Sequence, residues 1–393
     1  MLGLIEISAL KLQSHLFLWL YPCPIQWKSD YNGIKISQPS TSSYKLIPWS
    51  LSFIWLGVNL ILLLYESIVY RNLSPKPDFE RINVIIFLSC FAMLTFVLSV
   101  SITMLTLKET TVEFNTCLQM KKDMNTRFMH SSPKEDSIGM LLFLISLFGG
   151  ITPIFLTTTA VLLKIDPFYF FLKYEIFPSE KVETVLFYLI EGVLIFPCVA
   201  ECARLLVVTT SYLIILLQSI SSIAFALDKT RNRLSISSFK RWYSRITILY
   251  KILEPVLNII MYLAITFCFW GTVIYTWLLT KGFGKIGMSI YSFFAFMLIW
   301  IVGGNLITLP KYAGAGDRFV EMVKRNLQRA REQHVKLRTK ETKIALLEAK
   351  GIPPIKFKCG PFLFINLAFL TEHYFLVTQR VFDAILIFDY ECE

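Results

Sequence analysis

The stretch PPIKFKCGPFLFINLAFLTEHYFLVTQRVFDAILIFDY, residues 353–390, decides the fold. Between Phe362 and Phe388 it is long enough, at about 1.5 Å per helical residue, to cross a hydrocarbon core of about 30 Å. Polar and ionisable residues interrupt it, namely Thr371, Glu372, His373, Thr378, Gln379, Arg380 and Asp383. Because such groups are costly against lipid, the pattern favours a helix that lines an aqueous path inside a bundle or assembly. The alternative is an amphipathic helix docked on the membrane surface.

The rest of the chain predicts an all-α, polytopic membrane protein. It has 393 residues, of which 55% are hydrophobic and 33 are Phe, and its mean hydropathy is +0.57. Soluble globular domains are less apolar than this. Seven apolar segments are expected to form transmembrane helices: Ile47 to Val69, Ile82 to Leu107, Ile138 to Leu163, Val185 to Ile220, Leu253 to Thr280, Gly287 to Leu309 and Phe362 to Phe388.

The basic residues predict the orientation of these spans. Of the 39 Lys and Arg residues, 29 fall in the N-terminal segment and the second, fourth and sixth loops, and 8 fall in the other loops. Cytoplasmic loops keep the excess, so the N-terminus is expected in the cytoplasm and the C-terminus outside. The net charge of +11 is explained by this topology, and no nucleic-acid partner is expected. Asn72-Leu73-Ser74, in a loop expected outside, is an acceptor pattern for N-glycosylation.

Four regions follow from this topology. Residues 1–46 are a cytoplasmic N-terminal segment, residues 47–309 a six-helix ligand-sensing bundle, residues 310–360 a cytoplasmic basic helix and linker for subunit assembly, and residues 361–393 a seventh, pore-lining helix with a short extracellular tail. Gly314-Ala-Gly-Asp317 is expected to form a turn that ends the sixth span, with Asp317 capping the next helix. That helix, from Asp317 to about Lys350, has an apolar and a basic face. It is expected to pack against its copies in other subunits or, alternatively, to rest on acidic lipid headgroups.

Signatures of enzymes and of metal sites are missing from the sequence. There are four His residues, and no phosphate-binding loop, HExxH or GxSxG pattern occurs. Cys198 and Cys202 are one helical turn apart, but no set of His and acidic ligands converges with them in sequence, so two small buried side chains are expected there. The protein is therefore predicted to be no enzyme and to need no cofactor, and no disulfide framework is expected.

The C-terminal stretch resembles a known family. Residues 354–366, PIKFKCGPFLFIN, followed by a span ending in AILIF at residues 384–388, are similar to the C-terminal signature of the insect-type gustatory receptors, relatives of the insect odorant receptors. Where that family has a Thr-Tyr pair and then a Gln-Phe pair, this chain has Thr378-Gln379 and Ile385-Leu386. The resemblance is closest in this stretch and extends to the number and orientation of the spans.

This resemblance implies a multi-pass taste receptor of the plasma membrane that acts as a ligand-gated, nonselective cation channel in the lipid bilayer. Four like subunits, as a homotetramer or a heteromer with related receptors, would surround a pore lined by the final span of each. A small-molecule tastant would bind in an outward-facing pocket within each subunit. Two other classes stay open: a G-protein-coupled-type receptor, which needs an outside N-terminus, and a small-molecule transporter, which should show internal repeats with broken helices.

The candidate pore residues share one side of the final span. Residues three or four apart lie on the same face of a helix, and the stripe expected to face the pore comprises Gln379, Asp383, Leu386 and Asp389 or Tyr390, with Ile385 next to Leu386 as a further pore residue. In a fourfold ring Asp383 would concentrate cations, while Leu386 or Ile385 would close the path by an apolar constriction. Alternatively, Asp383 pairs with Arg380 on the same helix and only holds structure.

The candidate ligand-binding residues lie in the outer halves of spans two to six, which a molecule arriving from outside meets first. Aromatic walls with a few polar groups are the usual composition of a small-molecule site. The candidates are Phe91, Phe148, Phe155, Tyr188, Glu191, Trp277, Tyr291 and Phe294. The alternative is that most of these rings only fill the bundle. In span four, Glu201 and Arg204 are expected to form a structural pair, whereas Glu191 is expected beside water in an outward-open cavity.

Overall fold

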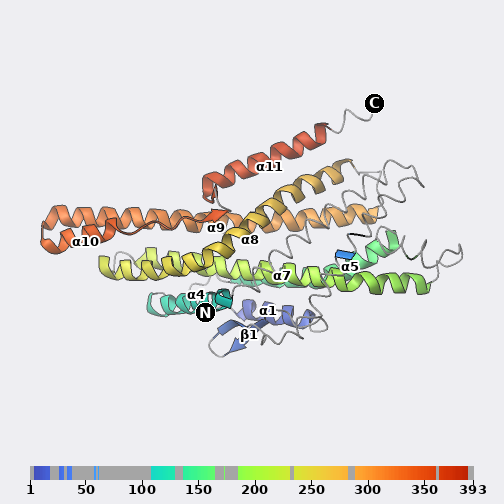
Figure 1. Cartoon of the computed structure of the whole chain (residues 1–393), viewed down its shortest axis with the longest axis horizontal. Helices are drawn as coiled ribbons and strands as arrows, with labels where there is room; N and C mark the ends of the chain where they lie inside the picture. The colour runs from blue at the N-terminus through green and yellow to red at the C-terminus, as the bar shows by residue number, and fades with distance from the viewer. Residues whose placement is uncertain are drawn as a thin grey trace.

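Long helices make up most of the described chain (Figure 1). This computed structural model describes residues 4–17, 26–30, 33–37, 57–58, 61, 108–128, 136–163, 172, 185–230, 234–281, 288–359 and 363–387. Its helices are α1 (Leu4–Leu16), α4 (Lys108–Phe128), α5 (Asp136–Leu163), α7 (Val185–Thr230), α8 (Ile236–Lys281), α9 (Met288–Leu337), α10 (Lys340–Lys350) and α11 (Leu367–Ile387). Two antiparallel hairpins pair β1 (Gln26–Asp30) with β2 (Gly33–Ser37) and β3 (Lys358–Cys359) with β4 (Leu363–Phe364).

Helices of membrane-spanning length and composition occur where the sequence predicts them. Within the described residues they are Gly139–Thr159, Val185–Thr230, Ile236–Lys281 and Phe294–Leu337, which overlap the third to sixth predicted spans. α11 takes the place of the seventh. The first two predicted spans lie almost wholly outside the described residues, and so do Asn72 and Phe91. The predicted helical architecture, with several apolar helices of membrane-spanning length, is thereby confirmed for the described residues.

α7, α8 and α9 continue far beyond the length that a bilayer requires. They contain 46, 46 and 50 residues, or about 70 to 75 Å at about 1.5 Å per residue. The turn predicted at Gly314 is wrong, because α9 passes through this region without a break and even includes Pro310. Glycine weakens a helix by only about 1 kcal/mol, less than the full burial of Tyr312 and Phe319 contributes on either side of it.

A regular spacing of apolar residues on α8 and α9 builds the core of their extended parts. Buried residues recur every three or four positions, as on any helix with one apolar face. They are Phe239, Tyr243, Ile246, Tyr250 and Leu253 on α8, and Phe319, Met322, Val323, Asn326 and Ala330 on α9, where Asn326 is the polar exception. The ring of Tyr243 joins the two helices, since its centroid is 5.7 Å from that of Phe239 and 6.1 Å from that of Phe319.

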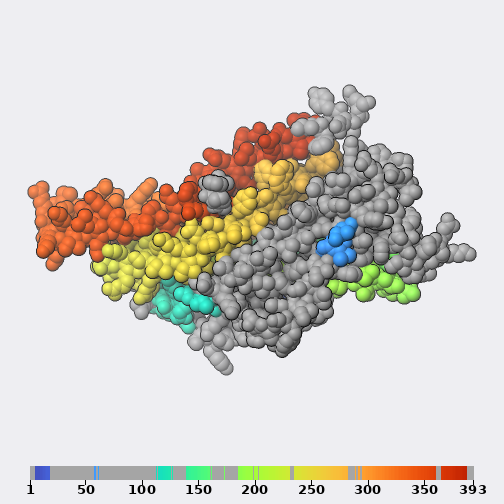
Figure 2. Space-filling view, in the orientation of Figure 1, coloured from blue at the N-terminus to red at the C-terminus, as the bar shows by residue number. Residues whose placement is uncertain are grey.

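α10 folds back on α9 at the narrow end of the molecule (Figures 1 and 2). Arg338 ends α9 with a φ of 48°, in the left-handed region, and Thr339 begins the next turn. The Thr339 hydroxyl accepts a hydrogen bond from the amide of Thr342 and so caps α10. Lys240 of α8 pairs with Glu348 of α10 at 3.3 Å, Nζ to Oε1, so α10 is tied to both long helices.

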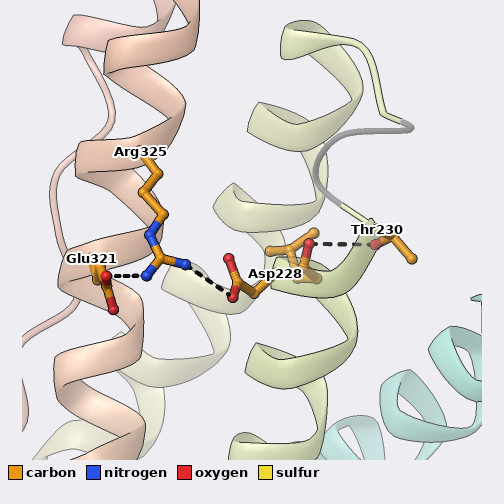
Figure 3. A network of polar contacts seen from close by, with 5 residues as sticks. Asp228, Thr230, Glu321 and Arg325 are labelled. Carbon is orange, nitrogen blue, oxygen red and sulfur yellow. Dashed lines mark hydrogen bonds and ion pairs between the residues drawn. The ribbon is translucent and has the colours of Figure 1, made fainter.

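Arg325 ties α9 to the last turns of α7 (Figure 3). Its guanidinium pairs with Glu321 on its own helix and lies 3.7 Å from Oδ2 of Asp228 on α7. At the last residue of α7, the Thr230 hydroxyl donates a hydrogen bond of 2.7 Å to the carbonyl of Ala226, one turn earlier in the same helix. Exposed ion pairs of this kind contribute only about 0 to 1 kcal/mol, so the apolar face of α9 holds the helices together.

α1 packs closely along the first half of α5. A Cβ added to Gly139 would lie 2.8 Å from Cβ of Ile5, and one added to Gly150 would lie 2.9 Å from Cδ1 of Leu16. Small residues allow such close approach between helices in a membrane. Residues 4–17 therefore lie alongside the beginning of the third predicted span.

Candidate ligand wall, pore helix and connecting strap

Two of the predicted ligand residues meet in a group of rings between α5 and α9. The centroid of Phe148 is 5.8 Å from that of Phe296 and 6.2 Å from that of Trp300, and Phe155 is 6.2 Å from Phe296. These four side chains are called the aromatic wall below. Phe148 and Phe155 are 39% and 37% exposed, so the wall is open on one side. The sequence reasoning missed Phe296 and Trp300, although their spacing of four residues places both on one face of α9.

Tyr188 and Glu191 form a second group on α7. Glu191 is fully buried, and the half-buried ring of Tyr188 lies edge-on to Phe187 at 5.7 Å. Phe187 in turn belongs to a small cluster with Val161. Glu191 is thus not turned to lipid, where a carboxylate would be costly. The outward-open, water-filled cavity expected beside it stays a prediction, because complete burial does not by itself give the carboxylate access to water.

The remaining candidates pack between α8 and α9. Phe294 is buried with its ring 5.8 Å from that of Tyr275, and Trp277 packs partly buried against the same cluster. Tyr291 is half-buried near the start of α9. The described candidates thus divide into three groups, of which the aromatic wall offers the most exposed rings.

Glu201 and Arg204 form a buried ion pair on α7, through Oε1 and Nη2. Both side chains are almost completely buried, three residues apart on one helix. The pairing predicted from their spacing is confirmed. A paired charge can stay at this depth where an isolated one would be costly.

α11 stands at the margin of the bundle and packs on α8 and α9 by one side (Figure 1). Leu370 and His373 are buried on that side, and the ring of His373 lies 6.1 Å from Phe269 of α8. The opposite side carries a stripe of exposed residues spaced by four, three and four positions, Phe375, Gln379, Phe382 and Leu386. Such a stripe of an apolar helix is available to contact other subunits, lipid or water.

The predicted pore residues lie on or beside this stripe. Gln379 and Leu386 are exposed, and Asp383 and Ile385 are half-buried. Asp383 Oδ2 lies 3.2 Å from Arg380 Nη1, so the alternative pairing weighed from the sequence is present within one subunit. Asp389 lies outside the described residues.

Residues 352–359 and 363–366, called the strap below, join α10 to α11 and are fixed to α8. The Tyr243 hydroxyl accepts a hydrogen bond of 2.9 Å from the amide of Ile355. Further along, the Tyr250 hydroxyl donates one of 3.1 Å to the carbonyl of Lys356. The two tyrosines are two helical turns apart and share one face of α8, so the strap runs along that face.

Phe357 anchors the strap in the core. Its ring stacks on Tyr312 of α9 with centroids 4.5 Å apart and planes at 13°, and lies 6.1 Å from Phe319. Only 1% of Phe357 is exposed. The next residue, Lys358, pairs with Glu254 of α8 at 2.8 Å, Nζ to Oε1. The strap is therefore held by buried rings, with polar contacts along its length.

Asp317 joins α9 to the first turn of α11. Its Oδ2 accepts a hydrogen bond of 3.1 Å from the amide of Leu367. Asn366 caps the same turn from the strap, because its Oδ1 accepts from the amide of Phe369 at 2.7 Å and its carbonyl from Leu370 at 3.2 Å. Asp317 was predicted to cap a helix starting at its own position. It contributes instead to the cap of α11, where a carboxylate also matches the positive end of the helix dipole.

This architecture defines a class: a multi-pass α-helical membrane protein whose long helices continue into a second bundle, with a separate final helix at its margin. Among solved structures it is similar to the insect olfactory receptor OR5 from Machilis hrabei in complex with eugenol, with a TM-score of 0.63 and 10% identity over 97% of this chain and 99% of that one. Another structure of that receptor gives a TM-score of 0.53 at 11% identity, again covering 97% and 99% of the two chains. No protein-family profile matches the chain, and neither does any curated protein. The chain therefore has the fold of an insect olfactory receptor.

Proposed function

We propose that this protein is a chemosensory receptor of the gustatory type that acts as a ligand-gated, nonselective cation channel. The observation that carries the proposal is α11, a helix with Glu372, Arg380 and Asp383 along it that packs by one side only. A lone helix with ionisable residues is costly against lipid. Four copies around an axis would give this exposed side an aqueous path to line.

The fold supports this proposal as a whole. It is shared, at fold level, with an olfactory receptor that binds the small aromatic molecule eugenol. The aromatic wall, with open rings on Phe148 and Phe155, has the composition of a site for a small, mainly apolar molecule. At the end of the molecule where α10 folds back on α9, the exposed apolar residues Val335, Leu337 and Ile344 suit contacts between subunits.

Cation flux in reconstituted liposomes tests the proposal. The purified protein is expected to pass thallium or potassium ions upon addition of eugenol or of one compound in a tastant panel, with no G protein present. In detergent it should run as four copies. A monomer that never passes ions would contradict the proposal, and an epitope at the N-terminus that is accessible from outside intact cells would favour the G-protein-coupled class instead.

Asp383→Asn is expected to lower the cation-to-anion permeability ratio by roughly twofold or more, because a ring of four carboxylates concentrates cations. Reversal potentials in asymmetric salt measure the ratio. The matched variant is Arg380→Gln, which removes the other half of the 3.2 Å ion pair. If Asp383 serves only that pair, the two variants will behave alike. If it faces the ion path, Arg380→Gln will keep or increase the cation preference.

Phe148→Ala is expected to raise the ligand concentration for half-maximal flux by up to about tenfold, since an aromatic contact contributes about 0.5 to 1.5 kcal/mol. Tyr188→Ala, in the second group, should shift it in the same direction. Phe143→Ala is the control, because Phe143 lies on the same helix and is 40% exposed, against 39% for Phe148, but points to a different side. Equal shifts for Phe143 and Phe148 would assign the effect to lipid contact and remove the aromatic wall from the ligand site.

A further inference from the structure

We propose that Asp317 is the coupling residue of this receptor, the contact through which α9 sets the position of the pore helix α11. This inference rests on the proposed channel function. To that function it adds the residue and the path that would connect the ligand site at the aromatic wall with the pore helix. The observation behind it is the 3.1 Å hydrogen bond from the amide of Leu367, the first residue of α11, to Oδ2 of Asp317.

α9 is a single helix that carries both ends of this route. Trp300 of the aromatic wall and Asp317 are on the same unbroken helix, about 25 Å apart at about 1.5 Å per residue. A helix of this kind moves as one body or bends at a defined point such as Pro310. If α9 has two positions and a ligand at the aromatic wall binds one of them more tightly, the ligand shifts the whole helix, including Asp317, toward that position. The size of the shift is set by the difference in affinity between the two positions.

Two residues cap the first turn of α11, and they belong to different elements of the structure. Asn366 belongs to the strap and moves with α11, since it bonds the amides of Phe369 and Leu370 in the next turn. Asp317 belongs to α9 and supplies a charged acceptor from a different helix. Both stabilise the helix start. Only the Asp317 contact fixes where that start lies relative to α9.

α9 approaches the strap closely next to this contact. A Cβ added to Gly316 would lie 3.4 Å from Cδ2 of Phe357 and 3.5 Å from the carbonyl oxygen of Ile365. One residue before Asp317, the space between α9 and the strap is thus no larger than a methyl group would fill. Because so little empty space separates α9 from the strap at Gly316, a displacement of α9 there is expected to move the strap and the start of α11 as well.

A distance measurement between α9 and α11 tests the position without any ligand. Spin labels are placed on Lys324→Cys and Phe375→Cys, both exposed positions on the two helices, in labelled subunits diluted with unlabelled ones. Burial raises the pKa of Cys117 to about 12 and that of Cys359 to about 11, so these native thiols stay protonated and react slowly. The remaining native cysteines that label are replaced by serine.

Asp317→Ala is expected to widen or shift the α9–α11 distance distribution, whereas Asn366→Ala should leave it as in the unsubstituted protein. Asp317→Asn keeps an oxygen acceptor and should restore the distribution in large part. If Asp317→Ala and Asn366→Ala change the distribution equally, or neither changes it, the inference is overturned. If Asp317→Ala fails to yield folded protein, Asp317→Ser, whose shorter side chain does not reach the amide of Leu367, replaces it in the comparison with Asn366→Ala, with the larger change expected for Asp317→Ser.

Eugenol-evoked flux separates this inference from the proposed function. Asp317→Ala should lower the maximal flux by about fivefold or more, the lower end of ordinary coupling between sites, while the concentration for half-maximal flux shifts less. Flux is normalised to the amount of folded protein in the liposomes, because a merely structural cap would lower that amount and leave the maximal flux per folded receptor unchanged. Absence of flux in the unsubstituted protein with eugenol and the tastant panel would count against the channel function alone, since the spin-label distances are read without a ligand.

Discussion

Phe357→Ala is expected to cost about 3 to 5 kcal/mol of folding free energy, the usual loss when a fully buried phenylalanine is truncated. The ring is 1% exposed and stacks on Tyr312 at 4.5 Å. Its removal leaves a cavity between α8, α9 and the strap, and the strap loses its anchor. Thermal unfolding of the detergent-purified protein measures the loss, and flux should disappear with it.

Phe364→Ala is the matched control for this change. Phe364 lies on the partner strand of the same hairpin, but it is 48% exposed, with Lys356 Nζ 5.5 Å from its ring centroid. Its truncation should cost less than about 1 kcal/mol, as for most exposed positions. Equal losses for Phe357→Ala and Phe364→Ala would show that the strap acts through its own hairpin and not through the core.

Gly149→Ala is expected to destabilise the packing of α5 on α7 by about 1 to 3 kcal/mol, the usual effect of overpacking. The added Cβ would lie 2.0 Å from Cγ2 of Val207, which is itself buried. Valine is branched at Cβ and has few rotamers, so it cannot turn aside cheaply. Surface abundance in cells and the unfolding temperature of the purified protein should both fall.

Two further variants isolate the cause. Gly192→Ala, on α7, adds a Cβ that meets nothing within 4 Å, so it should be neutral or slightly stabilising, as alanine is the better helix former. Gly149→Ala combined with Val207→Ala removes the Cγ2 atom that causes the clash and should recover part of the loss. If the double variant is no better than Gly149→Ala alone, the clash with Val207 is not the cause.

The apolar spans could be predicted from the sequence, but the ends of the long helices could not. α5 is described as far as Leu163, the predicted end of the third span. α8 begins at Ile236 and not at Leu253, since the basic residues before Leu253 predict a loop although Phe239, Tyr243 and Ile246 recur at helical spacing between them. A capping signal was present: the amide of Ser238 donates to the hydroxyl of Ser235 at 3.1 Å.

In the candidate site, features that depend on one helix could be predicted from the sequence, whereas contacts between helices could not. The stripe around Gln379 and Leu386 follows from spacing within one helix, and both residues are exposed. The meeting of Phe148 with Trp300 depends on how α5 and α9 pack, which no local pattern contains. The role of Asp317 was assigned to the wrong helix for this reason, because its partner Leu367 lies 50 positions later in the chain.

The strap also sets an order of events during synthesis. Its bonds to Tyr243 and Tyr250 join residues 112 and 106 positions apart. At a translation rate of about 5 to 20 residues per second, roughly 5 to 20 seconds pass between the synthesis of these tyrosines on α8 and the synthesis of the strap. Tyr312 and Phe319 are made 45 and 38 residues before Phe357, so for roughly 2 to 9 seconds they lack the ring that later covers them. A nascent chain that inserts its final helix wrongly would keep this aromatic surface bare, and chaperones that bind exposed apolar groups would retain it before it could assemble.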